Sequence, residues 1–126
     1  MAIAAQVHNK FKVFVGKSGQ IDDLARTVAA WALDAKVAPK SIGVEYLEGA
    51  KSLVLSIGYR DDEPPYPVRL TSQHVGRIDS LDSAGVARLE KAMAEATAKL
   101  SNIICHELFV TEANDFHMVF MTHDAK

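Results

Sequence analysis

Cysteine is almost absent from this sequence, because Cys105 is the only one among 126 residues. A single thiol cannot form an internal disulfide, and the chain has no CxxC or clustered Cys/His spacing of the kind that holds structural zinc. A chain of this length removes roughly two thirds of its unfolded surface from water, so it can build a core without such staples. We expect one domain over residues 1–126, with an ordered part from about residue 10 to about residue 122.

Long hydrophobic runs and an excess of basic residues are also missing. No stretch approaches the roughly 18 apolar residues that a membrane span needs, and the first ten residues lack the pattern of an export signal. We therefore expect a cytoplasmic protein that does not contact a membrane. Lys and Arg number 14 against 16 Asp and Glu. Proteins that neutralise many phosphates show the opposite balance, so long nucleic acid is not an expected partner.

The common catalytic motifs GxGxxG, GxxxxGK[ST], GxSxG and HExxH do not occur either. Cys105 and His106 are neighbours on a predicted strand, so their side chains point to opposite faces and cannot pair as nucleophile and base. The acidic run Asp61–Glu63 stands before two prolines and is typical of a solvated turn. We lean toward a non-enzymatic protein with no cofactor, catalytic residue or metal ligand. A small enzyme acting on a nucleotide-like ligand remains an alternative.

Hydropathy patterns predict two helices and five strands. The predicted strands are Lys10–Gly16, Ser41–Leu47, Leu53–Tyr59, Asn102–Val110 and Phe116–Met121, and the predicted helices are Ile21–Val37 and Leu81–Leu100. The intervening segment Asp61–Ser80 holds three prolines and is predicted to be a long loop. It contains a brief apolar alternation at Val68–Leu70, and whether this stretch pairs with a sheet edge stays open. The order β-α-β-β-α-β-β predicts an α+β fold, a ferredoxin-like split β-α-β with an extra C-terminal strand. We expect one antiparallel sheet with both helices on one face, and no internal repeat.

The last predicted hairpin is apolar on both faces. Alternation about a turn at Ala113–Asn114 divides the side chains between the two faces of the hairpin. One face carries Ile103, Cys105, Phe109, Phe116, Met118 and Phe120, and the opposite face carries Ile104, His106, Leu108, Val110, His117, Val119 and Met121. Helices would cover only one face, and an exposed apolar face of this size implies a partner. We therefore expect a homo-oligomer, a dimer or larger. An interaction module that docks another protein through this face is a second alternative.

The same alternation brings His106 and His123 onto one face of the predicted hairpin. Two imidazoles could share a metal ion. No third ligand converges on them, so we expect hydrogen-bonded histidines rather than a metal site.

Arginines and rings around the long loop predict a site for a small anionic, nucleotide-like ligand. Arginine presents a fork of donors that matches phosphate oxygens, and aromatic rings can stack on a base. The candidate ligand-binding residues are Arg60, Tyr66, Arg69, His74, Arg77, Asn114 and Phe116. The alternative is that these arginines only pair with neighbouring acids on the surface, as Arg60 could with Asp61 or Asp62.

Three short strings carry a resemblance to a known family. Ser56-Ile-Gly-Tyr59, Tyr66-Pro-Val68 and Ile104-Cys-His-Glu-Leu108, together with the length and element order, resemble the small phage proteins of the Thoeris anti-defence family. The resemblance spans most of the chain, from the first strand to the last hairpin. It implies an oligomer that sequesters cyclic ADP-ribose-type immune signals in pockets between subunits without cleaving them. It assigns no individual binding residue.

Overall fold

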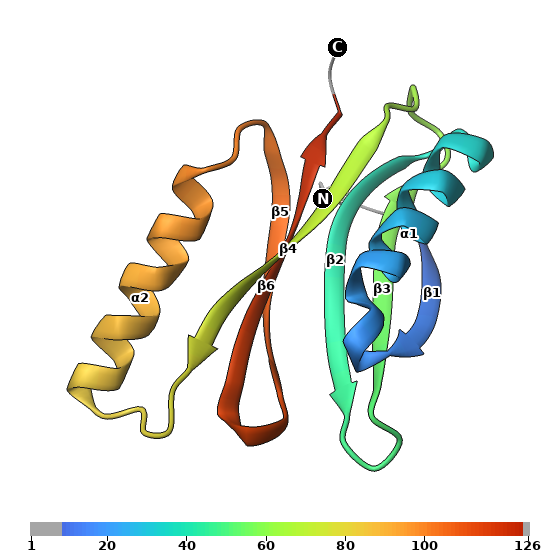
Figure 1. The fold of residues 1–126 in the computed structure, drawn as a ribbon. Helices are drawn as coiled ribbons and strands as arrows, with labels where there is room; N and C mark the ends of the chain where they lie inside the picture. Colours follow the sequence, from blue (N-terminus) through green and yellow to red (C-terminus); the bar gives the residue numbers. More distant parts are fainter. Residues whose placement is uncertain (1–8, 125–126) are drawn as a thin grey trace, which may run out of the picture.

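A computed structural model describes residues 9–124 and shows, over that range, an α+β fold of six strands and two α-helices (Figure 1). The first half consists of β1 (Lys10–Lys17), a 3₁₀ turn (Ser18–Gln20), α1 (Ile21–Ala35), β2 (Ala38–Leu47) and β3 (Ser52–Arg60). The second half consists of β4 (Val68–Arg77), α2 (Ser83–Ala98), β5 (Ile103–Thr111), a 3₁₀ turn (Glu112–Asn114) and β6 (Asp115–His123). The predicted mixed α+β class is confirmed.

Both halves have the order β-α-β-β, and each builds its own three-stranded antiparallel sheet. The strand orders are β1-β3-β2 and β4-β6-β5, so one topology occurs twice in the described range. Strands β2 and β5 lie side by side where the two sheets meet. One hydrophobic core takes side chains from α1 and from both sheets, and it joins the halves. The repeat is one of topology, which the amino-acid sequence does not reveal.

Strand β4 replaces most of the predicted loop and corrects the predicted element order. It pairs with β6 in an antiparallel register from Val68↔His123 to Arg77↔Asp115. Its sequence hides this because only Val68 and Leu70 are buried, and the segment Thr71–His74 is polar throughout. The three prolines all precede the strand, so they do not interrupt its hydrogen bonds.

The two predicted helices are confirmed, each slightly shorter than expected. Helix α1 ends at Ala35 because Lys36 adopts a left-handed conformation (φ 57°) and its amide donates to the carbonyl of Ala32. Helix α2 begins after Asp82, whose carboxylate caps the amide of Gly85 at 2.9 Å. A capping carboxylate there satisfies an amide that has no partner within the helix.

The helices cover opposite faces of the second sheet, whereas the sequence predicted one face. Alternate residues of β6 show the difference: Val119 and Met121 belong to the core shared with α1, while Met118 and Phe120 pack with Ala96 of α2. All four β6 side chains are between 0% and 1% exposed. The hairpin face that was expected to be open is therefore covered by α2 of the same chain.

The turn between β5 and β6 also differs from the prediction. It spans three residues, Glu112–Asn114, and Thr111 pairs with Asp115 across it. Ala113 and Asn114 both have left-handed backbones, with φ values of 60° and 57°. Asparagine tolerates this conformation, but alanine adopts it only at an energetic cost. The alanine at this position therefore does not predict the longer turn.

The extra turn residue shifts the hairpin register by one. Phe109 lies opposite His117 and Leu108 opposite Met118, whereas the predicted two-residue turn placed Leu108 and His117 on the same face. A one-residue slip moves every side chain of a strand to the other face of the sheet. Phe109 is therefore buried in the core with α1 and stacks on His117, with ring centroids 5.2 Å apart.

Candidate functional site

The predicted ligand-binding residues lie at two ends of the second sheet. Arg69 stands near the start of β4, opposite Thr122, and Arg77 stands at its end, opposite Asp115. The two arginines are eight positions apart on the strand, or roughly 26 Å. Tyr66 contacts His123, which is next in sequence to the partner of Arg69, while His74 and Asn114 lie near Arg77. No single site unites the predicted set.

Arg60 is held by carboxylates at the end of β3. Its guanidinium donates two hydrogen bonds to Asp62, at 2.8 and 2.7 Å, and lies 3.3 Å from Glu63. This bidentate pairing raises the pKa of Arg60 and lowers that of Asp62. A ligand phosphate would have to displace the carboxylate of Asp62, so Arg60 matches the predicted alternative of pairing with a neighbouring acid.

Tyr66 is half-buried between the two sheets. Its hydroxyl donates to the carbonyl of Pro39 at 2.5 Å, and its ring lies 4.5 Å from the ring of His123. Burial raises the pKa of Tyr66, although the nearby ammonium of Lys40 lowers it in part. The tyrosine therefore links β2 to the end of β6.

Arg69 borders a polar cavity of about 340 Å³ beneath the C-terminal end of α2. The cavity lies on the face of the second sheet that α2 covers, between that sheet and the link to β5. Its lining consists of Arg69, Thr71, Lys99, Leu100, Ser101, Asn102, Thr122, His123 and Asp124. Small-molecule sites are concavities of this order of size with a few convergent polar groups.

The cavity combines two basic side chains with one carboxylate. Arg69 and Lys99 supply the basic groups, and Asp124 lies 3.2 Å from the guanidinium of Arg69. Lys99 follows the last residue of α2, where its charge offsets the negative end of the helix dipole. Hydroxyl and amide groups of Ser101, Thr71 and Asn102 add further hydrogen-bond donors.

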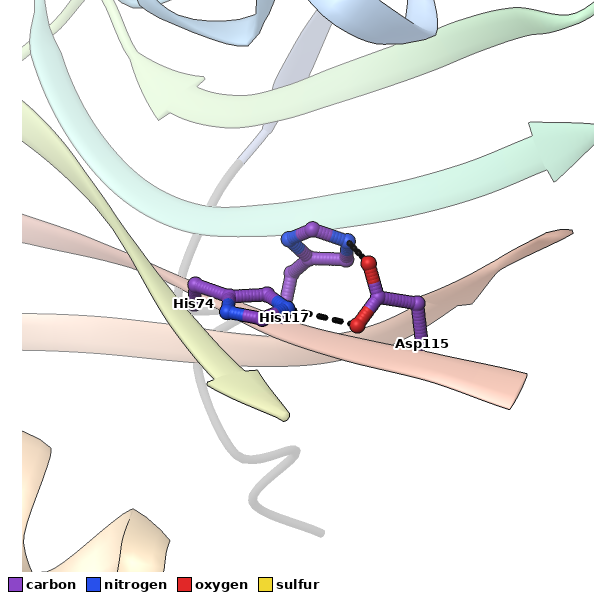
Figure 2. A group of neighbouring side chains, drawn as sticks. All are labelled: His74, Asp115 and His117. Atoms are coloured by element: carbon purple, nitrogen blue, oxygen red, sulfur yellow. Dashed lines mark hydrogen bonds and ion pairs between the residues drawn. The ribbon is translucent and has the colours of Figure 1, made fainter. Parts of the chain in front are cut away.

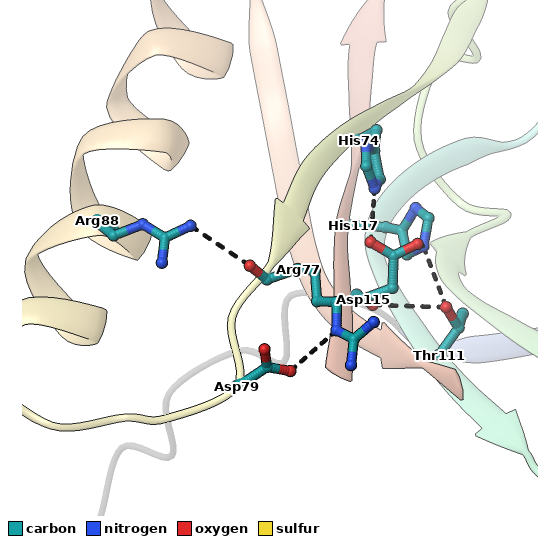
Figure 3. Close-up of polar contacts among 7 residues, drawn as sticks. All are labelled: His74, Arg77, Asp79, Arg88, Thr111, Asp115 and His117. Carbon is teal, nitrogen blue, oxygen red and sulfur yellow. Dashed lines mark hydrogen bonds and ion pairs between the residues drawn. The ribbon is translucent and has the colours of Figure 1, made fainter. Parts of the chain in front are cut away.

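At the other end of β4, Arg77 takes part in a chain of polar contacts (Figure 3). Its Nε donates to Asp79 at 2.9 Å, and Asn114 donates to the same carboxylate oxygen at 3.5 Å. Arg88 of α2 donates to the carbonyl of Arg77 at 3.4 Å. The Arg77 guanidinium lowers the pKa of Asp79, and the two charges largely compensate each other.

Beside this chain, two histidines and an aspartate from β4 and β6 converge (Figure 2). His74 and His117 are direct partners across the strands, and Asp115 stands two residues before His117 on the same face. The carboxylate of Asp115 lies between the rings, 2.5 Å from Nε2 of His74 and 3.4 Å from Nε2 of His117. Thr111 contacts the same nitrogen of His117 at 3.1 Å.

The remaining residues singled out from the sequence pack against other side chains of the fold. Phe116 is 7% exposed and lies opposite Gly76, so its ring belongs to the interior. His106 contacts the ring of Phe120 on the α2 face, whereas His123 contacts Tyr66, so the predicted His106–His123 pair does not form.

Sequence reasoning missed Lys99, Asn102, Asp115 and His117 as site residues. These residues were missed because strand β4 was not predicted. Without β4, the sequence does not reveal the cross-strand partner of His117 or the strand that forms the floor of the cavity under α2. Asn102 carries one local hint, since its left-handed backbone (φ 59°) suits an asparagine just before a strand.

No protein-family model, curated protein or solved structure matches this chain. Neither α1 nor α2 has the length and apolar character needed to cross a bilayer, and no other described helix does.

Proposed function

We propose that this protein binds a small nucleotide-like anion in the cavity beneath α2 and retains it without chemical change. The observation that supports this is the presence of Arg69 and Lys99 in the lining of one polar cavity of about 340 Å³. A phosphate can accept from the guanidinium fork of Arg69 and from the ammonium of Lys99.

The ligand class follows from the resemblance to the Thoeris anti-defence family. That family sequesters cyclic ADP-ribose-type signals, which carry two linked phosphates and an adenine ring. The cavity offers the guanidinium of Arg69 and the ammonium of Lys99 to the linked phosphates of such a ligand. The cyclic ADP-ribose isomers and cyclic nucleotides are therefore the first probes.

Self-association is part of the same proposal, but the surface that supports it is β1 and not the β5–β6 hairpin expected from the sequence. The β5–β6 hairpin is covered by α2, but the outer face of β1 exposes Val13 (54%) and Val15 (64%) to solvent. Alternating exposed valines on one strand are typical of a surface that a second copy covers. Native mass spectrometry of the protein and of Val15→Glu measures this directly, and an oligomer that Val15→Glu leaves intact contradicts the β1 interface.

The ligand test is titration calorimetry with each cyclic ADP-ribose isomer on the protein, Arg69→Ala and Lys99→Ala. Each substitution should weaken binding by more than about 1.5 kcal/mol, or more than tenfold in Kd, because it removes a charged hydrogen bond. Arg88→Ala is the matched control, since that guanidinium lies at the other end of the sheet.

Two results would overturn the proposal. Equal affinity in the protein, Arg69→Ala and Lys99→Ala places the ligand elsewhere, and no binding of any probe removes the ligand class. Recovery of the ligand after long incubation separates binding from turnover, because a chemically altered ligand favours the enzymatic alternative.

A further inference from the structure

We propose that His74, Asp115 and His117 form a binding site for one divalent transition-metal ion, with zinc as the best fit. The site lies on the face of the second sheet that α1 covers, away from the cavity beneath α2. It is separate from the proposed ligand function and does not depend on it.

The backbone itself brings the three side chains together. His74 and His117 are paired residues of adjacent antiparallel strands, so their rings lie side by side, with centroids 5.1 Å apart. The pairing shifts just after His74, where Gly76 has a φ of 135°. A bulge of this kind turns a side chain at the sheet end without disturbing the rest of the strand.

The donor atoms suit a first-row transition metal. Among the described residues this is the one group of three His, Cys, Asp or Glu side chains whose ligand atoms all lie within 4.8 Å of one another. Ligands bound tetrahedrally at the usual zinc distances stand roughly 3.4 Å apart, so small rotations of the side chains complete the geometry. Imidazole nitrogens favour zinc, copper and nickel over calcium or magnesium.

The surroundings hold the ligands in place and leave a route for the ion. The ring of His117 is stacked on Phe109, with an interplanar angle of 15°, and its side chain is 24% exposed. The side chain of His74 is 62% exposed, so one side of the cluster faces solvent. Three protein ligands leave a fourth position for water.

The electrostatics of the cluster favour a cation. The guanidinium of Arg77 pairs with Asp79 at 2.9 Å, whereas the carboxylate of Asp115 pairs with His74 and His117. Without metal, the Asp115 carboxylate contacts both rings, and the ion would take its place between them.

The test uses the full chain, free of any polyhistidine tag and stripped of metal. Zinc is titrated calorimetrically, and Co²⁺ is added separately to read the visible absorption of a tetrahedral site. We expect one zinc per chain and a tetrahedral Co²⁺ spectrum. His74→Ala and Asp115→Asn should each weaken zinc binding at least about tenfold, because removing even a supporting partner of a metal ligand costs that much.

His106→Ala is the matched control, since His106 is an exposed histidine on the opposite face, against Phe120. This variant should bind zinc with the same affinity and stoichiometry as the original protein. Zinc should also raise the Tm of the protein and of His106→Ala, but not that of His74→Ala, because an ion that binds only the folded state stabilises it.

The proposal is wrong if the protein takes up no zinc, or if His74→Ala and Asp115→Asn bind it as tightly as the protein does. A lower Tm in these variants without any zinc uptake by the protein also overturns it, because the cluster is then only a hydrogen-bond network. Arg69→Ala should retain the zinc site, so failure of the ligand proposal and failure of the metal proposal are distinguishable.

Discussion

Phe120→Ala is the substitution that tests the architecture most directly. Phe120 is 0% exposed and lies between β6 and α2, against Met118 and Ala96. The sequence alone left open which face of the β5–β6 hairpin the helices cover, whereas the structure covers the face of Phe120 with α2 of the same chain. The loss of unfolding free energy on removing the ring therefore tests whether α2 packs against Phe120.

The expected loss is about 4 kcal/mol of unfolding free energy. A fully buried aromatic ring removes roughly 150–250 Å² from water, which at about 25 cal/mol per Å² contributes roughly 4–6 kcal/mol. Phe→Ala substitutions in cores cost about 3–5 kcal/mol, because partial collapse of the cavity offsets some of the loss. Leu33→Ala is the control: Leu33 is 66% exposed on α1, and its loss should stay below about 0.5 kcal/mol.

Urea denaturation is the assay, followed both by far-UV circular dichroism and by fluorescence of the single tryptophan. Trp31 packs between Phe14 and Tyr59 in the first half, so its signal reports on unfolding far from Phe120. Measurements at two protein concentrations separate folding from association. A loss below about 1 kcal/mol, or a midpoint that shifts with concentration only in the original protein, would refute burial of Phe120 by its own α2.

Three further predictions follow from single contacts. Burial raises the pKa of Cys105 to about 11, so at pH 8 its thiol should react with iodoacetamide about 200-fold more slowly than a free thiol. The reaction rate should rise about tenfold with each added pH unit, because the thiolate is the reacting form. A rapid reaction whose rate does not depend on pH contradicts this. Asp82→Ala should cost about 1 kcal/mol in denaturation because it removes the α2 cap, and Asp82→Asn should restore most of it. Gly85→Ala should destabilise by more than about 1 kcal/mol despite alanine's helix propensity, since its Cβ would lie 1.8 Å from the Ser80 carbonyl; an unchanged Tm contradicts the packing.

Strong local patterns made much of the fold predictable. The alternation in Lys10–Gly16 and the helical spacing in Ile21–Val37 correspond to β1 and α1, which lie within a few residues of the predicted bounds. Asp82 stands directly before α2 and caps it, as its residue type favours at that position. In these cases the residues within one element determine the outcome, so local reasoning suffices.

The errors arose where a partner far along the chain decides the structure. Strand β4 is polar over Thr71–His74 and forms because β6 supplies its hydrogen bonds. Without β4, the prediction had no cross-strand partner for His117 and no second face for the β5–β6 hairpin. Gly85 illustrates the same limit, because its sequence position implies a weakened helix start, whereas the close approach of Ser80 requires a glycine.

The placement of the two proposed sites makes them energetically independent. Arg69 and His74 are five residues apart on β4, or roughly 16 Å, and odd and even positions of a strand face opposite sides of the sheet. Substitutions more than about 10 Å apart without shared contacts usually add within about 0.5 kcal/mol. The double variant Arg69→Ala/His74→Ala should therefore show each binding loss at its single-variant size. A larger coupling would mean that β4 shifts as a unit between the two sites, and the rigid sheet assumed for both proposals would have to be abandoned.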